Sequence, residues 1–88
     1  MEAVERDMYE LGWLNRRFDE HRPQLERVAC HLLGSLSEAE DAVQEAWRRL
    51  HRIDPDTVDD LGVWLTTVVS NECLRSLDLR KLRHERRT

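Results

Sequence analysis

Four polar residues in and just after the segment AEDAVQEAW could carry binding chemistry, because they share one face of a helix. They recur at i, i+3, i+4 and i+7, and they are Asp41, Gln44, Glu45 and Arg48. Two carboxylates, an amide and a guanidinium on one face can pair with a basic partner helix. Since a helix dipole also favours acidic side chains near its N-terminus, an ordinary solvated surface explains the same pattern. From these residues alone, both interpretations of this polar stripe stay open.

A second set of polar and aromatic residues lies further along the chain, again at helical spacing. Its members are Trp64, Thr67, Asn71, Arg75 and Asp78, and a basic run that contains Arg80, Lys81 and Arg83 follows. This combination is typical of single-stranded nucleic-acid binding, in which bases stack on an aromatic ring and cations follow the phosphates. The alternative for Trp64 is packing in the hydrophobic core, which is the more common place for a tryptophan.

The charge distribution favours an anionic partner at the C-terminal end. The whole chain carries a net charge of −4. Residues 73–88 hold six basic and two acidic residues, a net +4, whereas the rest holds eight basic and sixteen acidic residues, a net −8. A basic end on an acidic body indicates contact with an anion such as nucleic acid. Basic residues that complement the C-terminus of a helix are the other explanation.

The sequence lacks the residue patterns of catalytic and metal sites. Its four histidines are scattered, without a neighbouring nucleophile motif. There is no C-x-x-C or H-x-x-x-H spacing for a metal, and the three glycines form no phosphate-binding loop. We therefore expect a binding protein that uses no catalytic residue, metal or cofactor, rather than an enzyme.

Length and composition limit the chain to one small domain. It has 88 residues, of which 40% are hydrophobic and 36% charged, and only three glycines and two prolines, which favours a few long helices. No run approaches the roughly 20 apolar residues of a membrane-spanning helix, and the acidic N-terminus is unlike a secretory signal. Cys30 and Cys73 do not suggest a disulfide framework, so we expect a cytoplasmic protein with two free thiols and no contact with a membrane.

The first predicted helix covers about residues 3–33. Apolar residues recur in it at every seventh position, namely Val4, Leu11, Phe18, Leu25 and Leu32. Pro23 lies inside this pattern and removes a backbone donor, so we expect either one kinked helix or two nearly collinear helices. Gly34 is well suited to end the helix.

The second predicted helix, at residues 37–51, positions the polar stripe. The stretch SEAE at its start matches a capping box, in which the Ser37 hydroxyl accepts a hydrogen bond from a backbone N–H while Glu40 reaches back. The opposite face is apolar and consists mostly of small residues that allow close approach of another helix: Ala39, Ala42, Val43, Ala46 and Leu50. Trp47 flanks this face.

The third predicted helix, at about residues 60–82, positions the aromatic and basic residues. Asp59 or Asp60 begins it, after a loop that contains Pro55. Its apolar face consists of Leu61, Leu65, Val68, Val69, Cys73 and Leu77. The β-branched residues at 66–69 make a strand a competitor, but the flanking i, i+4 pattern favours a helix.

The predicted fold is all-α, a compact bundle of three to four helices in a single domain that spans residues 1–88. Few apolar residues remain in the basic C-terminal end, 78–88, and none follows Leu82. We therefore expect this end to be flexible.

Taken together, the segments resemble region two of bacterial sigma factors, specifically the extracytoplasmic-function group of the sigma-seventy family. The resemblance covers about residues 18–77. FDEHRPQLERVACHLLG resembles the first region-two helix, GSLSEAEDAVQEAWRRL the helix that docks on core RNA polymerase, and WLTTVVSNECLRSL the segment that melts and reads the −10 promoter element. The specific feature is the combination of D-x-x-Q-E in an otherwise apolar helix with W-L about twenty residues later.

The resemblance implies two macromolecular partners. Asp41, Gln44 and Glu45, with Arg48 in the same stripe, would contact the coiled coil on the largest subunit of core RNA polymerase. Asn71, Arg75 and the basic residues after them would lie at the −10 DNA, whose non-template strand is opened, with one base flipped out into a pocket. Sigma factors of this group are also often held by an anti-sigma protein.

Two departures from the family pattern affect these expectations. The order CLRSLD places Arg75 and Asp78 where the family commonly has an acid and then an arginine, which changes the charge that faces DNA. The 88 residues do not include the helix-turn-helix domain that reads the −35 element in this family, so we expect either an excised domain, which we favour, or a natural short form. The alternative function is a helical protein-interaction module that binds a regulator and has no role at DNA.

Overall fold

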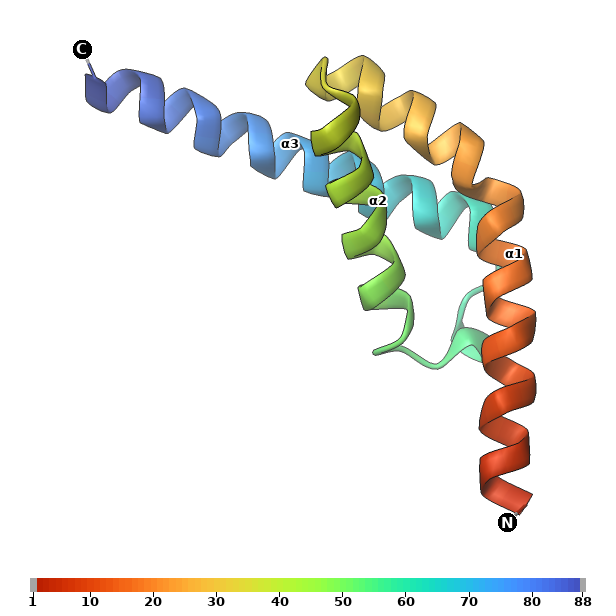
Figure 1. Ribbon diagram of the computed structural model, residues 1–88. Coiled ribbons are helices and arrows are strands. Elements are labelled where there is room, and N and C mark those ends of the chain that lie inside the picture. The colour runs from red at the N-terminus through yellow and green to blue at the C-terminus, as the bar shows by residue number, and fades with distance from the viewer. Residues whose placement is uncertain (1, 88) are drawn as a thin grey trace.

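Three α-helices and one short 3-10 helix make up the part of the chain that the structure describes. A computed structural model describes the backbone of residues 2–87 and the side chains of residues 12–54 and 56–86. The order is α1 (Glu2–Leu33), α2 (Leu36–Leu50), η1 (Pro55–Thr57) and α3 (Leu61–Arg87), and none of the described residues forms a strand (Figure 1). The predicted all-α bundle is confirmed, with three long helices.

α1 is one continuous helix that contains Pro23. Figure 1 shows α1 changing direction between its N-terminal (red) and C-terminal (yellow-orange) parts. A proline inside a helix lacks the backbone N–H and crowds the carbonyl one turn earlier, here that of Asp19, which is the usual cause of such a bend. The kinked-helix prediction is therefore confirmed. α1 ends at Leu33, and the next residue, Gly34, has a φ of 69° in the left-handed region and donates its N–H to the carbonyl of Cys30.

The hydrophobic core lies where the C-terminal part of α1, α2 and the N-terminal half of α3 pack on one another. Its fully or nearly buried residues are Leu14, Phe18, Leu25, Ala29, Leu33, Ala39, Ala42, Val43, Ala46, Leu50, Leu65, Val68, Val69 and Cys73. All five residues predicted for the buried face of α2 belong to this core. Leu33, rather than Leu32, is the buried residue at the end of α1, and Leu32 is partly buried against the core.

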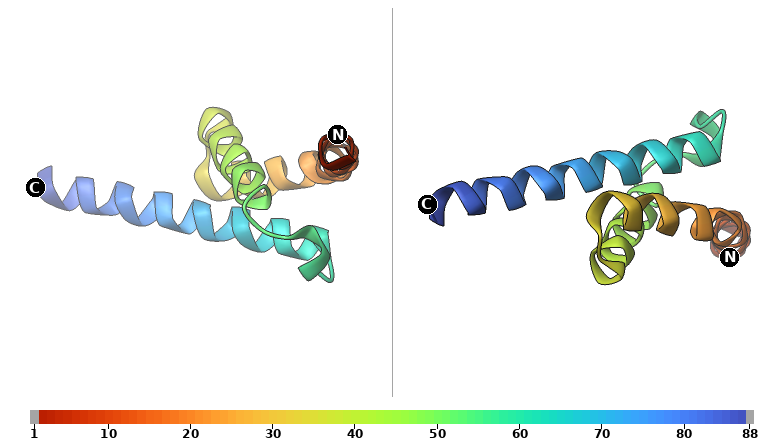
Figure 2. Two further views of the ribbon diagram at one scale, coloured as in Figure 1. Left: turned by 90° about the horizontal axis from the view of Figure 1, so that it is seen from below. Right: turned by 90° about the horizontal axis from the view of Figure 1, so that it is seen from above.

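The ends of two helices project from this core. Figures 1 and 2 show the N-terminal part of α1 and the C-terminal part of α3 extending beyond the other helices, in different directions. The helix α3 continues to Arg87 and so passes the predicted end at residue 82. Residues 83–86 in its last turns are exposed to solvent, which is consistent with the absence of apolar residues after Leu82.

The N-cap of α2 lies two residues before the predicted one. Ser35, rather than Ser37, is the N-cap, and its hydroxyl accepts a hydrogen bond from the Glu38 backbone N–H at 3.3 Å. Ser35 and Glu38 fit the same S-x-x-E spacing as Ser37 and Glu40, so local spacing could not separate the two sites. Ser35 is selected because the turn at Gly34 has already ended α1 there.

The start of α3 agrees with one of the two predicted caps. Asp60 accepts a hydrogen bond from the Val63 backbone N–H at 3.1 Å through its carboxylate. The loop before it contains η1, in which Asp54 accepts from the Asp56 N–H at 3.0 Å and from the Thr57 hydroxyl at 2.6 Å. These local bonds give the loop between α2 and α3 a defined path.

Candidate functional site

The polar stripe lies on the outer face of α2, opposite the alanines that pack in the core. Asp41, Gln44 and Arg48 are exposed, and Glu45 is half-buried toward α3. Because Ala42, Val43 and Ala46 are held against α1 and α3, the stripe is displayed from a fixed backbone. The structure therefore brings all four predicted residues together on one surface.

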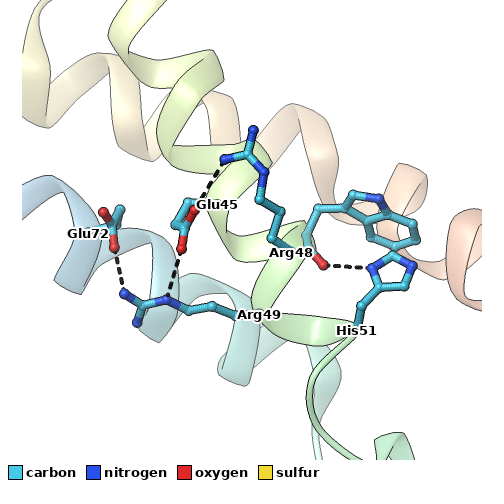
Figure 3. A network of polar contacts seen from close by, with 6 residues as sticks. Glu45, Arg48, Arg49, His51 and Glu72 are labelled. Carbon is cyan, nitrogen blue, oxygen red and sulfur yellow. Dashed lines mark hydrogen bonds and ion pairs between the residues drawn. The ribbon is translucent and has the colours of Figure 1, made fainter.

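Glu45 is the member of the stripe with the most intramolecular contacts. Its Oε2 accepts a hydrogen bond from Arg48 Nη1 at 3.2 Å, and its Oε1 lies 3.6 Å from Arg49 Nε (Figure 3). The hydrogen bond from Arg48 holds the pKa of the Glu45 carboxyl below its usual range, with smaller contributions from neighbouring arginine charges, although partial burial acts in the opposite direction. Glu45 is therefore an anion at neutral pH.

Arg49 links this stripe to the third helix. Its Nη2 donates to Glu72 Oε2 on α3 at 2.9 Å, so one guanidinium spans carboxylates from two helices (Figure 3). Neither Arg49 nor Glu72 was singled out from the sequence. The i, i+4 spacing of Glu45 and Arg49 could have indicated their pairing, whereas the contact with Glu72 depends on how α2 packs on α3.

A polar groove of about 340 Å³ lies on the surface between α2 and the middle of α3. Both helices supply charged side chains to it, and the lining consists of Glu38, Asp41, Ala42, Glu45, Glu72, Ser76, Leu79, Arg80 and Arg83. Two of its acidic residues, Asp41 and Glu45, belong to the stripe, and the groove also contains the cations Arg80 and Arg83.

The end of α2 is held on α1 by aromatic contacts. The rings of Trp47 and Phe18 lie 4.8 Å apart between their centroids, and His51 packs edge-on against Trp47 at 4.2 Å. His51 Nδ1 also lies 2.9 Å from the carbonyl oxygen of Trp47 (Figure 3). Trp47 thus acts as a packing residue that flanks the core, as predicted.

The residues predicted to contact DNA are divided among different surfaces of α3. Thr67, Asn71 and Arg75 are exposed, whereas Trp64 is half-buried and packs against the core. Trp64 therefore packs against the core, as the alternative interpretation predicted, and part of its side chain stays accessible.

Thr67 and Asn71 line a second groove, between α1 and α3, with a volume of about 610 Å³. Its lining is rich in hydroxyl and amide groups and comprises His21, Gln24, Asp60, Gly62, Val63, Thr66, Thr67, Ser70 and Asn71. His21 and Gln24 come from α1 and were not identified from the sequence. A side chain at position 62 would meet His21, since an added Cβ would lie 2.9 Å from its Cε1, so the glycine allows this close approach.

The side chains of the basic run have different surroundings within the chain. Arg80 donates to the carbonyl of Leu33 at 3.4 Å and forms an ion pair with Glu38, so it connects α3 to the turn between α1 and α2. Arg83 lines the groove between α2 and α3, and Lys81 is exposed near Asp78. None of these three residues lines the groove that contains Asn71.

The described residues hold no cluster of three or more histidine, cysteine or acidic side chains that could bind a metal ion. Cys30 and Cys73 are free thiols, and burial raises the pKa of Cys73. Among the helices described, none is both long and apolar enough to cross a membrane.

The sequence matches the family described as Sigma-70 region 2 over residues 17–87, which is most of the chain. The chain belongs to the sigma-70 family. Two relatives identify the type of this region 2 domain. ECF RNA polymerase sigma factor SigJ of Mycobacterium tuberculosis H37Rv is 47% identical over 72 residues, which cover 81% of this chain and 22% of the relative. Probable ECF RNA polymerase sigma factor SigI of the same species is 39% identical over 66 residues, which cover 75% of this chain and 23% of the relative.

The sigma-70 region 2 domain thus spans less than a quarter of the length of these curated relatives. No solved structure matches it significantly. The family match and the relatives support a sigma-factor domain of transcription initiation, and the extracytoplasmic-function resemblance seen in the sequence is confirmed.

Proposed function

We propose that this sigma-70 region 2 domain binds core RNA polymerase through the polar stripe of α2. The observation that carries the proposal is the presentation of Asp41, Gln44 and Glu45 on one outer face, backed by buried alanines and with Glu45 ionised. Carboxylate and amide groups fixed in this way suit a basic helical partner, such as the coiled coil of the largest polymerase subunit, because the directions of their hydrogen bonds specify its register.

The second part of the proposal is recognition of the −10 promoter element as a non-template single strand. Thr67 and Asn71 present a hydroxyl and an amide in the groove between α1 and α3, and Gln24 and Ser70 add further groups that can bond to a base. Arg75 lies exposed one turn beyond Asn71, where it can reach a phosphate. The base edges would be read in the groove, while the cation contributes affinity without sequence preference.

The basic residues after Arg75 have two different roles in this proposal. Lys81 and Arg83 are cationic side chains for DNA phosphates on the projecting end of α3. Arg80 is engaged by Leu33 and Glu38, so it would contribute to DNA binding mainly by holding that end in place.

A module that binds a protein regulator, such as an anti-sigma protein, is the second candidate function. Large apolar side chains on the outer part of α3 favour it, because Leu74, Leu79 and Leu82 are about half exposed. Docking on polymerase and capture by a regulator can both be properties of one domain.

The proposal is tested by measuring binding of the chain to purified core RNA polymerase, followed by selection of oligonucleotides on the complex. Selection of one related set of single-stranded sequences supports both parts. Binding to polymerase with no sequence preference would leave only the docking part, and no binding to polymerase would favour the regulator-binding candidate.

A further inference from the structure

Glu45 has different partners on its two carboxylate oxygens, and this division separates an outer contact from an inner one. Arg48, bonded to Oε2, has a side chain that is 62% exposed. Arg49, near Oε1, is 36% exposed and lies between α2 and α3. An incoming partner can therefore replace or join Arg48 without disturbing Arg49, which approaches the carboxylate from the inner side.

Arg49 is itself held by a residue from another helix. Its bond to Glu72 is 2.9 Å long, and the Glu72 side chain is only 19% exposed. The other described ion pairs lie on more exposed surface, as in the pair of Arg17 and Glu20, whose side chains are 46% and 62% exposed. A half-buried pair is less screened by water and salt, so this link restricts the arginine more strongly than a surface pair would.

We infer that Arg49 and Glu72 are positioning residues that orient the Glu45 carboxylate for polymerase docking. This inference rests on the proposed function. Glu72 on α3 fixes the guanidinium of Arg49, and Arg49 holds the inner oxygen of Glu45, which leaves the outer oxygen to the exposed Arg48. Neither residue has to touch polymerase, and Glu72 lies on a different helix from the stripe.

The link also prevents repulsion between two carboxylates across the interface of α2 and α3. Glu45 and Glu72 line the same groove and share one guanidinium. Without Arg49, two partly desolvated anions would face the same groove, and Glu45 would adopt other rotamers to reach water. The cost to docking is then the loss of a preferred side-chain orientation rather than the loss of a contact.

The test uses the 88-residue chain and core RNA polymerase purified from M. tuberculosis, the source of the matched relatives. Arg49→Met and Glu72→Met each remove one side of the link while keeping a long helix-forming side chain. We expect each to weaken polymerase binding by roughly three- to tenfold. Glu20→Met is the matched control, because it removes an exposed ion pair on α1, and it should bind as the parent chain does.

The decisive comparison is made in a Glu45→Gln background, where no carboxylate remains to be oriented. In that background, Arg49→Met should cause no further loss of polymerase affinity. In the parent chain, the double variant Arg49→Met/Glu72→Met should bind polymerase no more weakly than either single variant. An equal loss of affinity in both backgrounds would show that Arg49 only stabilises the fold, and would overturn the inference. Thermal unfolding of each variant shows whether any loss follows stability.

Failure of this inference can be told from failure of the proposed function. If Gln44→Ala and Glu45→Ala weaken polymerase binding but Arg49→Met and Glu72→Met do not, only the positioning role is wrong. If none of the four substitutions changes polymerase binding, the docking function itself is wrong, and the positioning role is lost with it.

Discussion

The guanidinium of Arg80 on α3 donates a hydrogen bond to the backbone carbonyl of Leu33, the last residue of α1, at 3.4 Å. The final carbonyls of a helix have no partner within that helix, so a cation from another element can satisfy one of them and complement the negative end of the helix dipole. The same guanidinium pairs with Glu38 in the first turn of α2. One side chain thus connects the projecting helix to the turn between the other two.

Replacing Arg80 should therefore lower the stability of the domain. We expect Arg80→Gln to reduce the free energy of unfolding by about 0.5–1 kcal/mol, since the bonds are long or partly exposed. Lys81→Gln removes a neighbouring exposed cation and should change stability by less than about 0.5 kcal/mol. Urea unfolding followed by circular dichroism measures both. Equal stability of the two variants would mean that the contact with Leu33 does not hold α3.

The polar stripe is expected to act mainly in polymerase binding, with only a small contribution to folding from the ion pairs of Glu45. The double variant Gln44→Ala/Glu45→Ala should weaken binding to core polymerase by about tenfold or more, because two hydrogen-bonding groups are lost from the interface. Its helix content should be unchanged, since alanine is a strong helix former. Glu20→Ala, which removes a similar i, i+3 ion pair from α1, serves as the control. Unimpaired binding of the double variant would rule out the stripe as a docking surface.

The groove between α1 and α3 and the exposed arginine are expected to have different effects on DNA binding. Asn71→Ala should weaken binding to the selected single-stranded sequence by about five- to a hundredfold. The affinity for that sequence should then approach the affinity for a scrambled sequence. Arg75→Gln should weaken both sequences alike and reduce the dependence of log affinity on log salt by about one. Titrating DNA into the complex of this chain and polymerase at several salt concentrations distinguishes the two effects. A loss of sequence preference in Arg75→Gln instead would reverse the assigned roles.

The titration of Glu45 should depend on Arg48. In the folded chain, the hydrogen bond from Arg48 keeps the pKa of Glu45 below its usual range. The ion pairs of Glu45 therefore stabilise the fold fully at a pH above the pKa that the Glu45 carboxyl has in the unfolded chain. This stabilisation is lost as the pH falls through the lower pKa of Glu45 in the folded chain. Arg48→Ala should raise the pKa of Glu45, as followed by carbon-13 NMR of the carboxyl group. An unchanged pKa would show that the hydrogen bond does not form in solution.

The alanines of α2 set how closely this helix approaches its neighbours. Ala46 is fully buried. Ala46→Leu should lower the free energy of unfolding by about 1–3 kcal/mol, because a larger side chain forces α2 away from the core. Glu40→Leu adds a leucine on the exposed side of the same helix and should have little effect on stability. Chemical denaturation measures both variants, and a fully stable Ala46→Leu would mean that α2 has space beneath it.

The sequence by itself determined which residues share a face of each helix. Periodicity is a local property, since 3.6 residues per turn convert spacing directly into direction around a helix axis. For that reason the buried face of α2 and the outward display of Asp41, Gln44 and Glu45 could be predicted without knowledge of any neighbour. The cap at Asp60 and the end of α1 at Gly34 also follow from local hydrogen bonding.

Only the tertiary structure decided which faces meet. The groove that both His21 and Asn71 line, and the ion pair of Arg49 with Glu72, depend on the distance and angle at which the helices pack. These quantities follow from how side chains of separate helices interdigitate, and no spacing within one helix encodes them. The same reason explains the contact of Arg80 with Leu33, which no spacing within the basic run could indicate.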